Sequence, residues 1–385
     1  MLAAVQAIGA EQVALGAAHG RTLASPVIAA RDQPPFAASA MDGYAFRAAD
    51  APGALRVAGE AAAGHAFVRA LQRGEAVRIS TGAPMPAGAD VVLIQEEARL
   101  EGDTLHVAEM APGRHVRPAA CDFARGAVLL ESGRRLDAAE VALAAACGAA
   151  TVTVARRPRV AILGGGDELA APGTSPRPDQ IFDSCSYGVA ALVERCGGVA
   201  VCAPLLPDDP DRIADAAAAA IGTSDLVVFI GSASVGPHDH ARAAFERHDA
   251  RLLVPKVDMR PGKPTWFATT PGAAVLGLPG NPASALVASA LFLEPLLDVM
   301  QGRSGETSAR FAKLAHAVPA NGPREAFLRA AVSADAAGQL HIDASRDQDS
   351  SLLSVFASSN ALLVRPPHAP AAAAGATASY IAWQG

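Results

Sequence analysis

Residues 158–300 alternate between short apolar runs and amphipathic segments, and this alternation constrains the fold more than any other feature. The runs RVAIL (159–163), DLVVFI (225–230) and AAVLGL (273–278) are apolar throughout their interiors. A strand that is apolar on both faces belongs to a sheet covered on both faces, and such sheets are mostly parallel because helices connect their strands. The sequence therefore predicts a mostly parallel α/β sheet here.

The segments between the runs have the spacing and start signals of helices. In YGVAALVERCG (187–197), apolar residues recur at helical spacing on one face. Asp209 followed by Pro210 is typical of a helix N-cap with proline at the first helical position. Further strands are expected at VAVCAPLL (199–206) and RLLVPKV (251–257), and further helices at HARAAFERH (240–248) and ASALVASALFLEPLLDVM (283–300).

The flanking sequence predicts three further parts around an α/β domain at 158–304. Residues 1–30 have the pattern of a helix leading into a strand, and 127–157 return to a helical pattern that ends at Gly148, so together they predict a helical linking domain. Residues 31–126 carry short strands separated by Gly and Pro, which predicts a β-rich lobe with a hairpin turning near Gly102–Asp103. Residues 305–385 predict a small C-terminal β domain.

Composition excludes several classes of function. The net charge of −6 over 385 residues argues against a general nucleic-acid binder, which needs a basic face. The N-terminus lacks the basic start of a signal peptide, and Gly, Pro and charges interrupt every apolar stretch, so no membrane helix is expected. The 5 cysteines form no C-x-x-C pair, which favours reduced thiols in the cytoplasm.

Glycine-rich or charged loops follow the predicted strands. They are Gly164–Glu168, Gly231–Gly236 with Asp239 beyond it, Arg260–Pro264 and Pro279–Ser284. In an open parallel sheet, ligands bind beyond the carboxyl ends of the strands. Any one such loop is usually only a turn, but four at successive strand ends favour a binding site.

These loops have the chemistry of an anion and metal site. Glycines let backbone N–H groups approach an anion, and the helix start at Asn281–Pro282 attracts a phosphate or oxyanion. Arg260 and Lys263 add positive charge. Asp167, Glu168 and Asp239 suit Mg²⁺, which usually binds through one or two carboxylates and substrate phosphates.

The β-rich lobe offers a second set of candidates. Ser39–Tyr44 contains an Asp-Gly turn, Thr81–Pro86 is a loop, and Glu96 ends a strand. From the residues alone, ordinary turns and a binding site remain equally open.

Six motifs resemble one family. PPF…SAMDGYA (34–45), RISTGAPMPAGADVV (78–92), RPRVAILGGGDEL (157–169), SVG…D (234–239), RPGKP (260–264) and LPGNPASALV (278–287) are similar, in order, to those of the molybdopterin molybdenumtransferases, the MoeA and gephyrin E-domain family. The similarity runs from about residue 20 to the C-terminus.

The resemblance implies an elongated, cytoplasmic homodimer in which 1–30 and 127–157 form a dimerisation domain. It implies that adenylylated molybdopterin and molybdate react, in the presence of Mg²⁺, to give molybdenum cofactor and AMP. A molybdopterin adenylyltransferase and client molybdoenzymes are the implied partners. It assigns catalytic roles to Asp239, Asp42, Thr81, Lys256 and Lys263, and metal binding to Asp167, Glu168 and Asp239. In the family, the lobe of one subunit faces the other subunit's crevice, so Asp42, Thr81 and Asp122 would complete the site across the dimer. The substrate-binding residues expected from the loops and the resemblance are Gly165, Gly166, Glu168, Asp208, Gly231, Ser234, Gly236, Arg260, Pro279, Gly280, Asn281, Pro282, Ser284 and Asp122.

The sequence departs from the family at several of these positions. The family's Ser-Thr-Gly-Asp-Glu-Leu is Gly164–Leu169 here, so two hydroxyl side chains are missing. Its Ser-Gly-Gly-Val-Ser-Val-Gly becomes Ile230–Gly236, and its Gly-Glu-Asp becomes Ala120–Asp122. The Asp-Asn after Pro-Pro-Phe is Ala37–Ala38, and Arg260 replaces a lysine, which keeps the charge but changes its geometry.

Three functions follow. The first is an active molybdenum insertase. The second is a pterin- or cofactor-binding module that delivers with little turnover, which the missing hydroxyls favour. The third is a molybdopterin adenylyltransferase or nucleotide hydrolase, which the two flanking β regions argue against.

Overall fold

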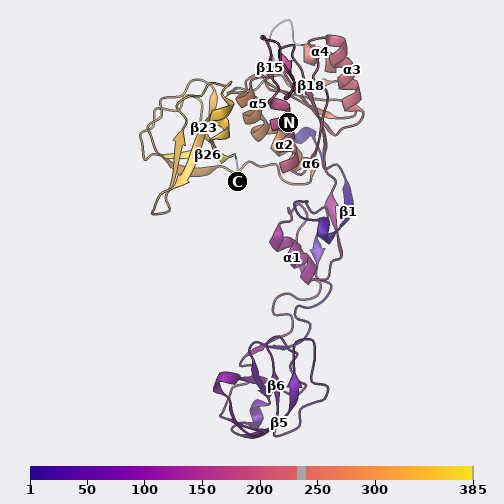
Figure 1. The fold of residues 1–385 in the computed structure, drawn as a ribbon, viewed down its shortest axis with the longest axis vertical. Helices are drawn as coiled ribbons and strands as arrows, with labels where there is room; N and C mark the ends of the chain where they lie inside the picture. The colour runs from indigo at the N-terminus through magenta and orange to yellow at the C-terminus, as the bar shows by residue number, and fades with distance from the viewer. Residues whose placement is uncertain (232–239, 384–385) are drawn as a thin grey trace. The chain divides into compact units, whose positions relative to one another are not determined.

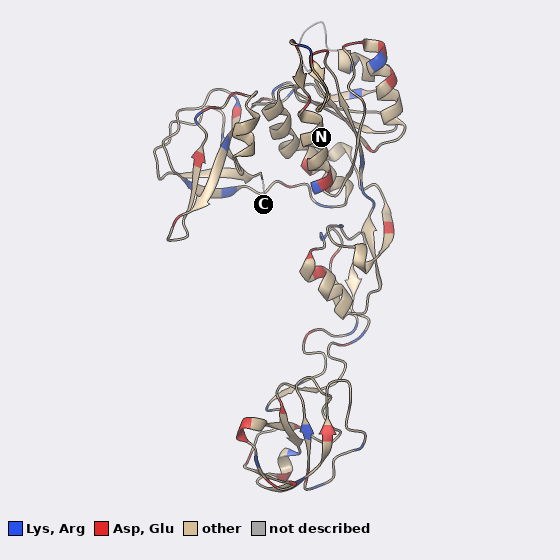
Figure 2. Ribbon diagram, viewed as in Figure 1, with Lys and Arg blue, Asp and Glu red and all other residues tan. Residues whose placement is uncertain are grey.

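The computed structural model describes residues 1–231 and 240–383, and its chain divides into two compact units (Figure 1). Unit 1 comprises Met1–Glu11, Gly20–Ala24 and Thr153–Gly385, and unit 2 comprises Gln12–His19 and Ser25–Val152. Acidic and basic residues are interspersed within each unit (Figure 2).

The centre of unit 1 is a six-stranded sheet in the order β16-β13-β17-β21-β20-β18. The first four strands are mutually parallel, whereas β20 runs antiparallel to both of its neighbours. The strands are β13 (Arg159–Gly164), β16 (Val199–Cys202), β17 (Leu226–Ile230), β18 (Arg251–Val254), β20 (Trp266–Thr269) and β21 (Ala274–Leu278). The predicted mostly parallel sheet is confirmed.

Helices cover both faces of this sheet. Val160 and Ile162 of β13 pack with α2 and α5 in one core, and the alternate residues Ala161 and Leu163 pack with α3 and α4 in the other. The α helices are α2 (Cys185–Arg195), α3 (Pro210–Ile221), α4 (His240–Glu246), α5 (Pro282–Ala288) and α6 (Glu294–Met300), and the π-helical turn η5 (Ser289–Leu293) joins the last two. Asp209 caps α3 by accepting from two backbone N–H groups, as predicted.

Two details of the strand and helix predictions are wrong. Residues 1–30 contain no α-helix: they form the 3₁₀ turns η1 (Leu2–Ala4) and η2 (Leu15–Ala17) and the strands β1 (Ala10–Ala14) and β2 (Val27–Ile28). β1 pairs with β12 (Thr151–Ala155), so a long-range strand pairing overrides a weak helical preference. The predicted strand 251–257 ends at Val254, and the antiparallel strand β20 was not anticipated.

Among the described helices, the segment Pro282–Met300 is as long and as apolar as a membrane span by length and composition. Of this segment, 72% is buried inside the protein, where it supplies both neighbouring cores. Its apolar character is therefore explained by packing.

The C-terminal part of unit 1 is the predicted small β domain. Its sheet has the order β19-β23-β24-β22-β26-β25, and β25 also pairs with β23, so the sheet closes on itself. The elements are β19 (Met259–Arg260), β22 (Arg310–Leu314), β23 (Glu325–Ala334), β24 (Leu340–Ala344), α7 (Leu353–Ala357), β25 (Ala361–Arg365) and β26 (Thr377–Ala382). β19 belongs to the Arg260–Pro264 loop, so its parallel pairing with β23 ties that loop to the C-terminal domain.

Unit 2 contains the β-rich lobe and the helix α1. The lobe's six-stranded sheet has the order β7-β4-β6-β5-β9-β8, and Gly102 turns the predicted hairpin between β8 and β9 with φ of 60°. Its elements are β4 (Gly43–Phe46), η3 (Ala48–Asp50), β5 (Gly53–Ala61), β6 (Glu75–Ile79), β7 (Val91–Ile94), η4 (Gln95–Glu97), β8 (Arg99–Glu101) and β9 (Thr104–Val107). The helix α1 (Ala138–Ala146) starts at a capping box of Asp137 and Glu140, and Gly148 follows its end with φ of 91°.

Five short strands complete the two units. β3 (Ala38–Ser39) pairs with β10 (Val116–Arg117), and β11 (Val128–Leu130) pairs with β2. In unit 1, β14 (Leu169–Ala170) pairs in parallel with β15 (Ile181–Phe182), which leads into α2.

Candidate functional site

The strands that precede the predicted loops end at one edge of the central sheet. β13, β17 and β21 are parallel, and β18 runs in the same direction because β20 lies antiparallel between β21 and β18. The chain therefore leaves all four strands at the same edge, where a pocket of about 610 Å³ lies. This strand-end pocket is lined by Gly164, Gly165, Glu168, Leu169, Ile181, Phe182, Asp183, Ser184, Cys185, Ile230, Gly231, Pro264, Pro279, Gly280, Asn281, Pro282 and Ser351.

The structure brings seven of the predicted substrate-binding residues into this pocket, and it adds others that the sequence did not single out. The predicted ones are Gly165, Glu168, Gly231, Pro279, Gly280, Asn281 and Pro282. Asp183 and Ser351 are the main additions. Asp183 precedes a helix and looks like an ordinary cap in the sequence, and Ser351 comes from the C-terminal domain.

Three described glycines of these loops do not offer the backbone donors that the sequence suggested. The N–H groups of Gly165, Gly166 and Gly231 donate to the carbonyl oxygens of Ile230, Leu206 and Leu278 at 3.0, 3.1 and 3.4 Å. These bonds extend the strand pairing beyond the regular strands, so the expectation of anion binding by these three N–H groups is wrong.

The glycines serve close packing instead. Gly231 has φ of 123°, and a Cβ atom there would overlap the carbonyl oxygen of Gly165. A Cβ on Gly165 would lie 3.3 Å from Cζ of Phe229, and one on Gly164 would lie 2.7 Å from Oγ of Ser186. At Gly164 and Gly165, where the family has hydroxyl side chains, Ser186 and Phe229 therefore occupy the space that such side chains would need.

The start of α5 is held by a loop of the C-terminal domain. Asn281 is its N-cap residue and Pro282 its first residue, as predicted. The Asn281 amide donates to Oγ of Ser350 at 3.1 Å, and the Ala283 N–H donates to the Ser350 carbonyl at 3.0 Å. One N–H at this helix start is therefore already paired.

Arg329 in turn supports the 345–352 loop that carries Ser350. Its side chain, only 1% exposed, donates to the carbonyl oxygens of Asp349 and Leu352 at 2.8 and 3.2 Å, and to Gln348. Burial lowers the pKa of Arg329, which nearby acidic charges partly offset. The buried guanidinium thereby fixes the loop against α5.

A second pocket, of about 470 Å³, adjoins the first and shares Pro264 with it. This basic pocket is lined by Arg260, Pro261, Gly262, Lys263, Pro264, Ser284, Arg324, Phe327, Leu328, Gln348, Asp349 and Ser350. It brings together the predicted Arg260, Lys263 and Ser284, and Arg324 adds a cation from the C-terminal domain. The predicted Lys256 is exposed and lies outside the lining of both pockets.

Of the predicted metal-binding acids that the structure describes, Glu168 lines the strand-end pocket and Asp167 lies beside it. Gly166 and Asp167 line a neighbouring hollow of about 450 Å³. The Asp208 N–H donates to the Asp167 carboxylate at 3.3 Å, and the Asp167 N–H is 3.5 Å from the Asp208 carboxylate, so these acids face each other. Within the described part of the chain, no three His, Cys, Asp or Glu side chains are grouped to hold a metal.

In unit 2, Asp42 and Thr81 form a direct pair. Oδ1 of Asp42 accepts from the Thr81 backbone N–H at 2.6 Å and from its hydroxyl at 2.9 Å. These bonds, with the charge of Arg78, hold the pKa of the Asp42 carboxyl below its usual range. Asp122 is also exposed, and its backbone N–H donates to Gln33.

The predicted Ser234, Gly236 and Asp239 lie outside the described residues. Cys185 lines the strand-end pocket, and burial, with the charge of Asp183 second, raises the pKa of its thiol to about 11. A neutral thiol is a poor nucleophile and a poor metal ligand, so Cys185 shapes the pocket instead.

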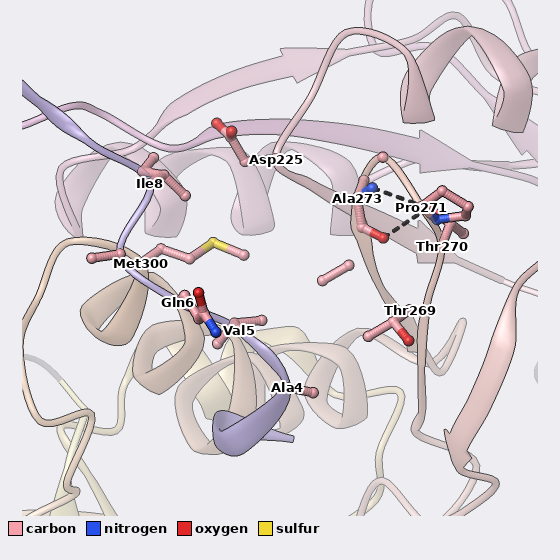
Figure 3. Close-up of a pocket in the computed structure, with 13 residues that line it drawn as sticks. Ala4, Val5, Gln6, Ile8, Asp225, Thr269, Thr270, Pro271, Ala273 and Met300 are labelled. Carbon is pink, nitrogen blue, oxygen red and sulfur yellow. Dashed lines mark hydrogen bonds between the residues drawn. The ribbon is translucent and has the colours of Figure 1, made fainter.

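A further hollow lies at the opposite edge of the central sheet. It measures about 490 Å³ and lies between the N-terminal segment Ala4–Ile8 and the Thr269–Ala274 turn (Figure 3). The carboxylate of Asp225 at its rim is already paired with Arg156 at 2.7 Å and with the Arg159 N–H at 2.8 Å. Because open parallel sheets bind ligands at their carboxyl edge, the strand-end pocket is the better candidate.

Comparison with known proteins shows the family and the fold of this chain. Three family models match: "MoeA N-terminal region (domain I and II)" at residues 1–148, "Probable molybdopterin binding domain" at 161–299, and "MoeA C-terminal region (domain IV)" at 312–383. The structure is similar to that of a molybdopterin biosynthesis MoeA protein from Pyrococcus horikoshii, with a TM-score of 0.86 and 29% identity, covering 100% of this chain and 97% of that one.

Curated relatives carry one name. Molybdopterin molybdenumtransferase of Nostoc sp. is 36% identical over 370 residues, covering 92% of this chain and 85% of that protein. The protein of the same name from Haemophilus influenzae is 34% identical over 361 residues, covering 92% and 89%. The resemblance found in the motifs is confirmed, and the chain belongs to the molybdopterin molybdenumtransferase (MoeA) family, a family of transferases in molybdenum cofactor biosynthesis.

Proposed function

We propose that this protein transfers molybdenum from molybdate to adenylylated molybdopterin, and that it releases AMP and the finished cofactor. The observation that carries the proposal is the pairing of two pockets. The strand-end pocket can enclose the ring systems of a large ligand, and the adjoining basic pocket carries Arg260, Lys263 and Arg324. A substrate with a pyrophosphate and an oxyanion as co-substrate needs both environments.

The three cations have distinct positions but one electrostatic role. Arg260 and Lys263 belong to the Arg260–Pro264 loop, which follows β18, and Arg324 directly precedes β23. Molybdate is a tetrahedral dianion, so fixed cations would attract it and neutralise charge that develops as the phosphoanhydride bond breaks. Ser284 at the same pocket would donate a hydrogen bond to an oxyanion.

Mg²⁺ fits the acids present if ligand phosphates complete its coordination. Asp167 and Asp208 face each other at the edge of the strand-end pocket, and Glu168 lines it. Mg²⁺ characteristically takes one or two carboxylates together with phosphate oxygens and water. When bound there, it would neutralise phosphate charge.

The residues of unit 2 would complete the site in a cytoplasmic homodimer. The low pKa of Asp42 keeps its carboxylate charged at neutral pH, as metal binding or donor recognition requires. Thr81 orients that carboxylate through two hydrogen bonds to one oxygen, which leaves the second oxygen for another partner. Asp122 would act beside them.

A second candidate is a protein that binds and delivers the pterin cofactor with little turnover. The pairing of the Gly165, Gly166 and Gly231 N–H groups within the chain favours it, because these three glycines then contribute shape to the pocket but no donors. Tight cofactor binding without AMP release would identify this alternative.

The deciding experiment mixes the purified protein with adenylylated molybdopterin, molybdate and Mg²⁺, and measures AMP and cofactor formation. We expect Lys263→Ala to raise the KM for molybdate by about 10- to 100-fold, because hydrogen bonds to charged groups are among the strongest. Lys313→Ala is the matched control, since Lys313 is a half-buried lysine of β22 that lines neither pocket and donates to the Thr377 hydroxyl at 2.8 Å. A wild-type protein that forms neither product would refute the proposal, and ATP consumption with molybdopterin would indicate an adenylyltransferase.

A further inference from the structure

The strand-end pocket and the basic pocket differ in charge. Among the described residues, the strand-end pocket is lined by two carboxylates, Asp183 and Glu168, and by no Lys or Arg. The basic pocket carries the three cations. A ligand with an anionic end and a ring end is therefore oriented: its anion belongs in the basic pocket and a donor-bearing ring edge belongs near the carboxylates.

Asp183 is the more confined of the two acids. It is only 6% exposed, between β15 and α2, and its own N–H donates to the Ala170 carbonyl at 2.9 Å. Its Oδ1 accepts from the Ser186 N–H at 3.1 Å. Its Oδ2 lies on the side of Gly164, since a Cβ atom on that glycine would lie 3.8 Å from this oxygen.

A role as helix cap accounts for only part of this arrangement. Capping the first turn of α2 uses one oxygen, and a serine or asparagine would provide it equally well. Asp183 lines the pocket, and among the described residues no hydrogen bond reaches its Oδ2. Burying a carboxylate oxygen is costly unless a donor pairs with it.

We propose that Asp183 determines specificity in this pocket by accepting two parallel N–H groups from the aminopyrimidinone edge of the pterin. This inference rests on the proposed function and adds the orientation of its substrate. A pterin presents a ring N–H beside an exocyclic amine, and a carboxylate accepts from both. Adenine presents its amine beside an unprotonated ring nitrogen, whose lone pair repels a carboxylate. Guanine carries the same ring N–H beside an exocyclic amine as a pterin does. Its binding therefore tests recognition of this edge separately from recognition of the rest of the pterin ring.

The test compares the binding of 6-hydroxymethylpterin, guanosine and adenosine, which all lack phosphate, to the full-length wild type and to Asp183→Asn. The asparagine keeps an oxygen for the Ser186 N–H but turns an amide donor or an uncharged acceptor toward the pocket. Asp179→Asn is the control, because it removes the same charge from an exposed acid that pairs with Arg177. Thermal unfolding and circular dichroism check that both variants fold.

We expect the wild type to bind the pterin at least as tightly as guanosine and more tightly than adenosine. Asp183→Asn should weaken pterin binding by about 10- to 100-fold, and Asp179→Asn should change it less than threefold. Unchanged pterin binding by folded Asp183→Asn, an equal loss for all three ligands, or tighter wild-type binding of adenosine or guanosine than of the pterin would overturn the inference. AMP release by the wild type tests the proposed function independently, so turnover combined with any of these results rejects only the role of Asp183.

Discussion

Gly165 and Phe229 lie on neighbouring strand ends, and each limits what the other can be. A Cβ atom on Gly165 would be 3.3 Å from Cζ of Phe229 and 3.7 Å from the Leu206 carbonyl oxygen. Phe229 is 1% exposed and packs edge-on against Phe245 with ring centroids 6.3 Å apart. A threonine at residue 165, which the family carries, therefore conflicts with the phenylalanine.

The packing around residues 165 and 229 sets the expected losses in the free energy of unfolding. Gly165→Thr overfills the space and should cost about 1–3 kcal/mol of the free energy of unfolding. Phe229→Ala leaves a cavity and should cost about 3–5 kcal/mol. In the double variant the threonine enters the space that the ring vacated, so the loss should fall at least about 1 kcal/mol short of the sum of the single losses.

Urea unfolding followed by tryptophan fluorescence measures these values in the right part of the protein. Both tryptophans, Trp266 and Trp383, belong to unit 1, so their fluorescence reports its unfolding separately from unit 2. Equal slopes of free energy against urea would validate the comparison among variants. Phe327→Ala combined with Gly165→Thr is the control, because Phe327 lies in a different hydrophobic cluster from Phe229.

If the double variant loses as much free energy of unfolding as the two single variants together, within about 0.5 kcal/mol, Gly165 and Phe229 are not coupled and the predicted steric conflict is refuted. A control pair that couples equally strongly would also refute it. The double variant should further show whether a restored hydroxyl changes AMP release, with Phe229→Ala as its reference.

Other positions give independent predictions. Gly231→Ala should destabilise unit 1 by about 2–3 kcal/mol in urea unfolding, because its φ of 123° and the nearby carbonyl oxygen exclude a side chain; a loss below about 0.5 kcal/mol would contradict this. A side-chain hydrogen bond from Arg69 and a backbone hydrogen bond from Gln72 lower the pKa of Glu75 in unit 2 from 4.5 to about 2. The stabilisation from Glu75 is therefore complete above about pH 4.5 and lost as pH falls toward 2. Glu75→Gln should reduce the fall in melting temperature between about pH 4.5 and 2, measured by thermal unfolding. Arg329→Met and Arg329→Lys should both raise the KM for molybdate severalfold with a smaller change in kcat, since a lysine cannot replace the forked donor that holds the loop of the basic pocket; full rescue by lysine would argue against this positioning role.

The central sheet could be predicted from the sequence because its signals are local. The runs 159–163, 225–230 and 273–278 are apolar on both faces, and Asp209 with Pro210 marks a helix start without ambiguity. Where local signals are weak, prediction failed. Residues 1–30 contain helix-forming side chains, yet β1 pairs with a strand about 140 residues away. Strand β20 is only 4 residues long and follows a Pro-rich loop, so it left little signal.

The candidate site was predictable at the level of loops but less so at the level of atoms. Strand direction alone places the loops at one edge, because parallel strands end together. Ser351 and Arg324 were missed because the pairing of β19 with β23, far apart in the sequence, brings the C-terminal domain to the site. Asp183 was missed because it stands just before a helix, where an acid in the sequence looks like an ordinary cap.

The structure also changes what the altered glycine loops mean for the proposed activity. Had Gly165, Gly166 and Gly231 held the anion through backbone N–H groups, any change in these loops would alter anion binding directly. Their N–H groups instead pair within the chain, and the cations surround a separate pocket built from the Arg260–Pro264 loop and the C-terminal domain. Loss of the two hydroxyl side chains should therefore alter the shape of the ring-binding pocket more than the affinity for molybdate. A kinetic comparison separates these effects: Gly165→Thr with Phe229→Ala should change the KM for the pterin substrate, whereas Lys263→Ala should change the KM for molybdate.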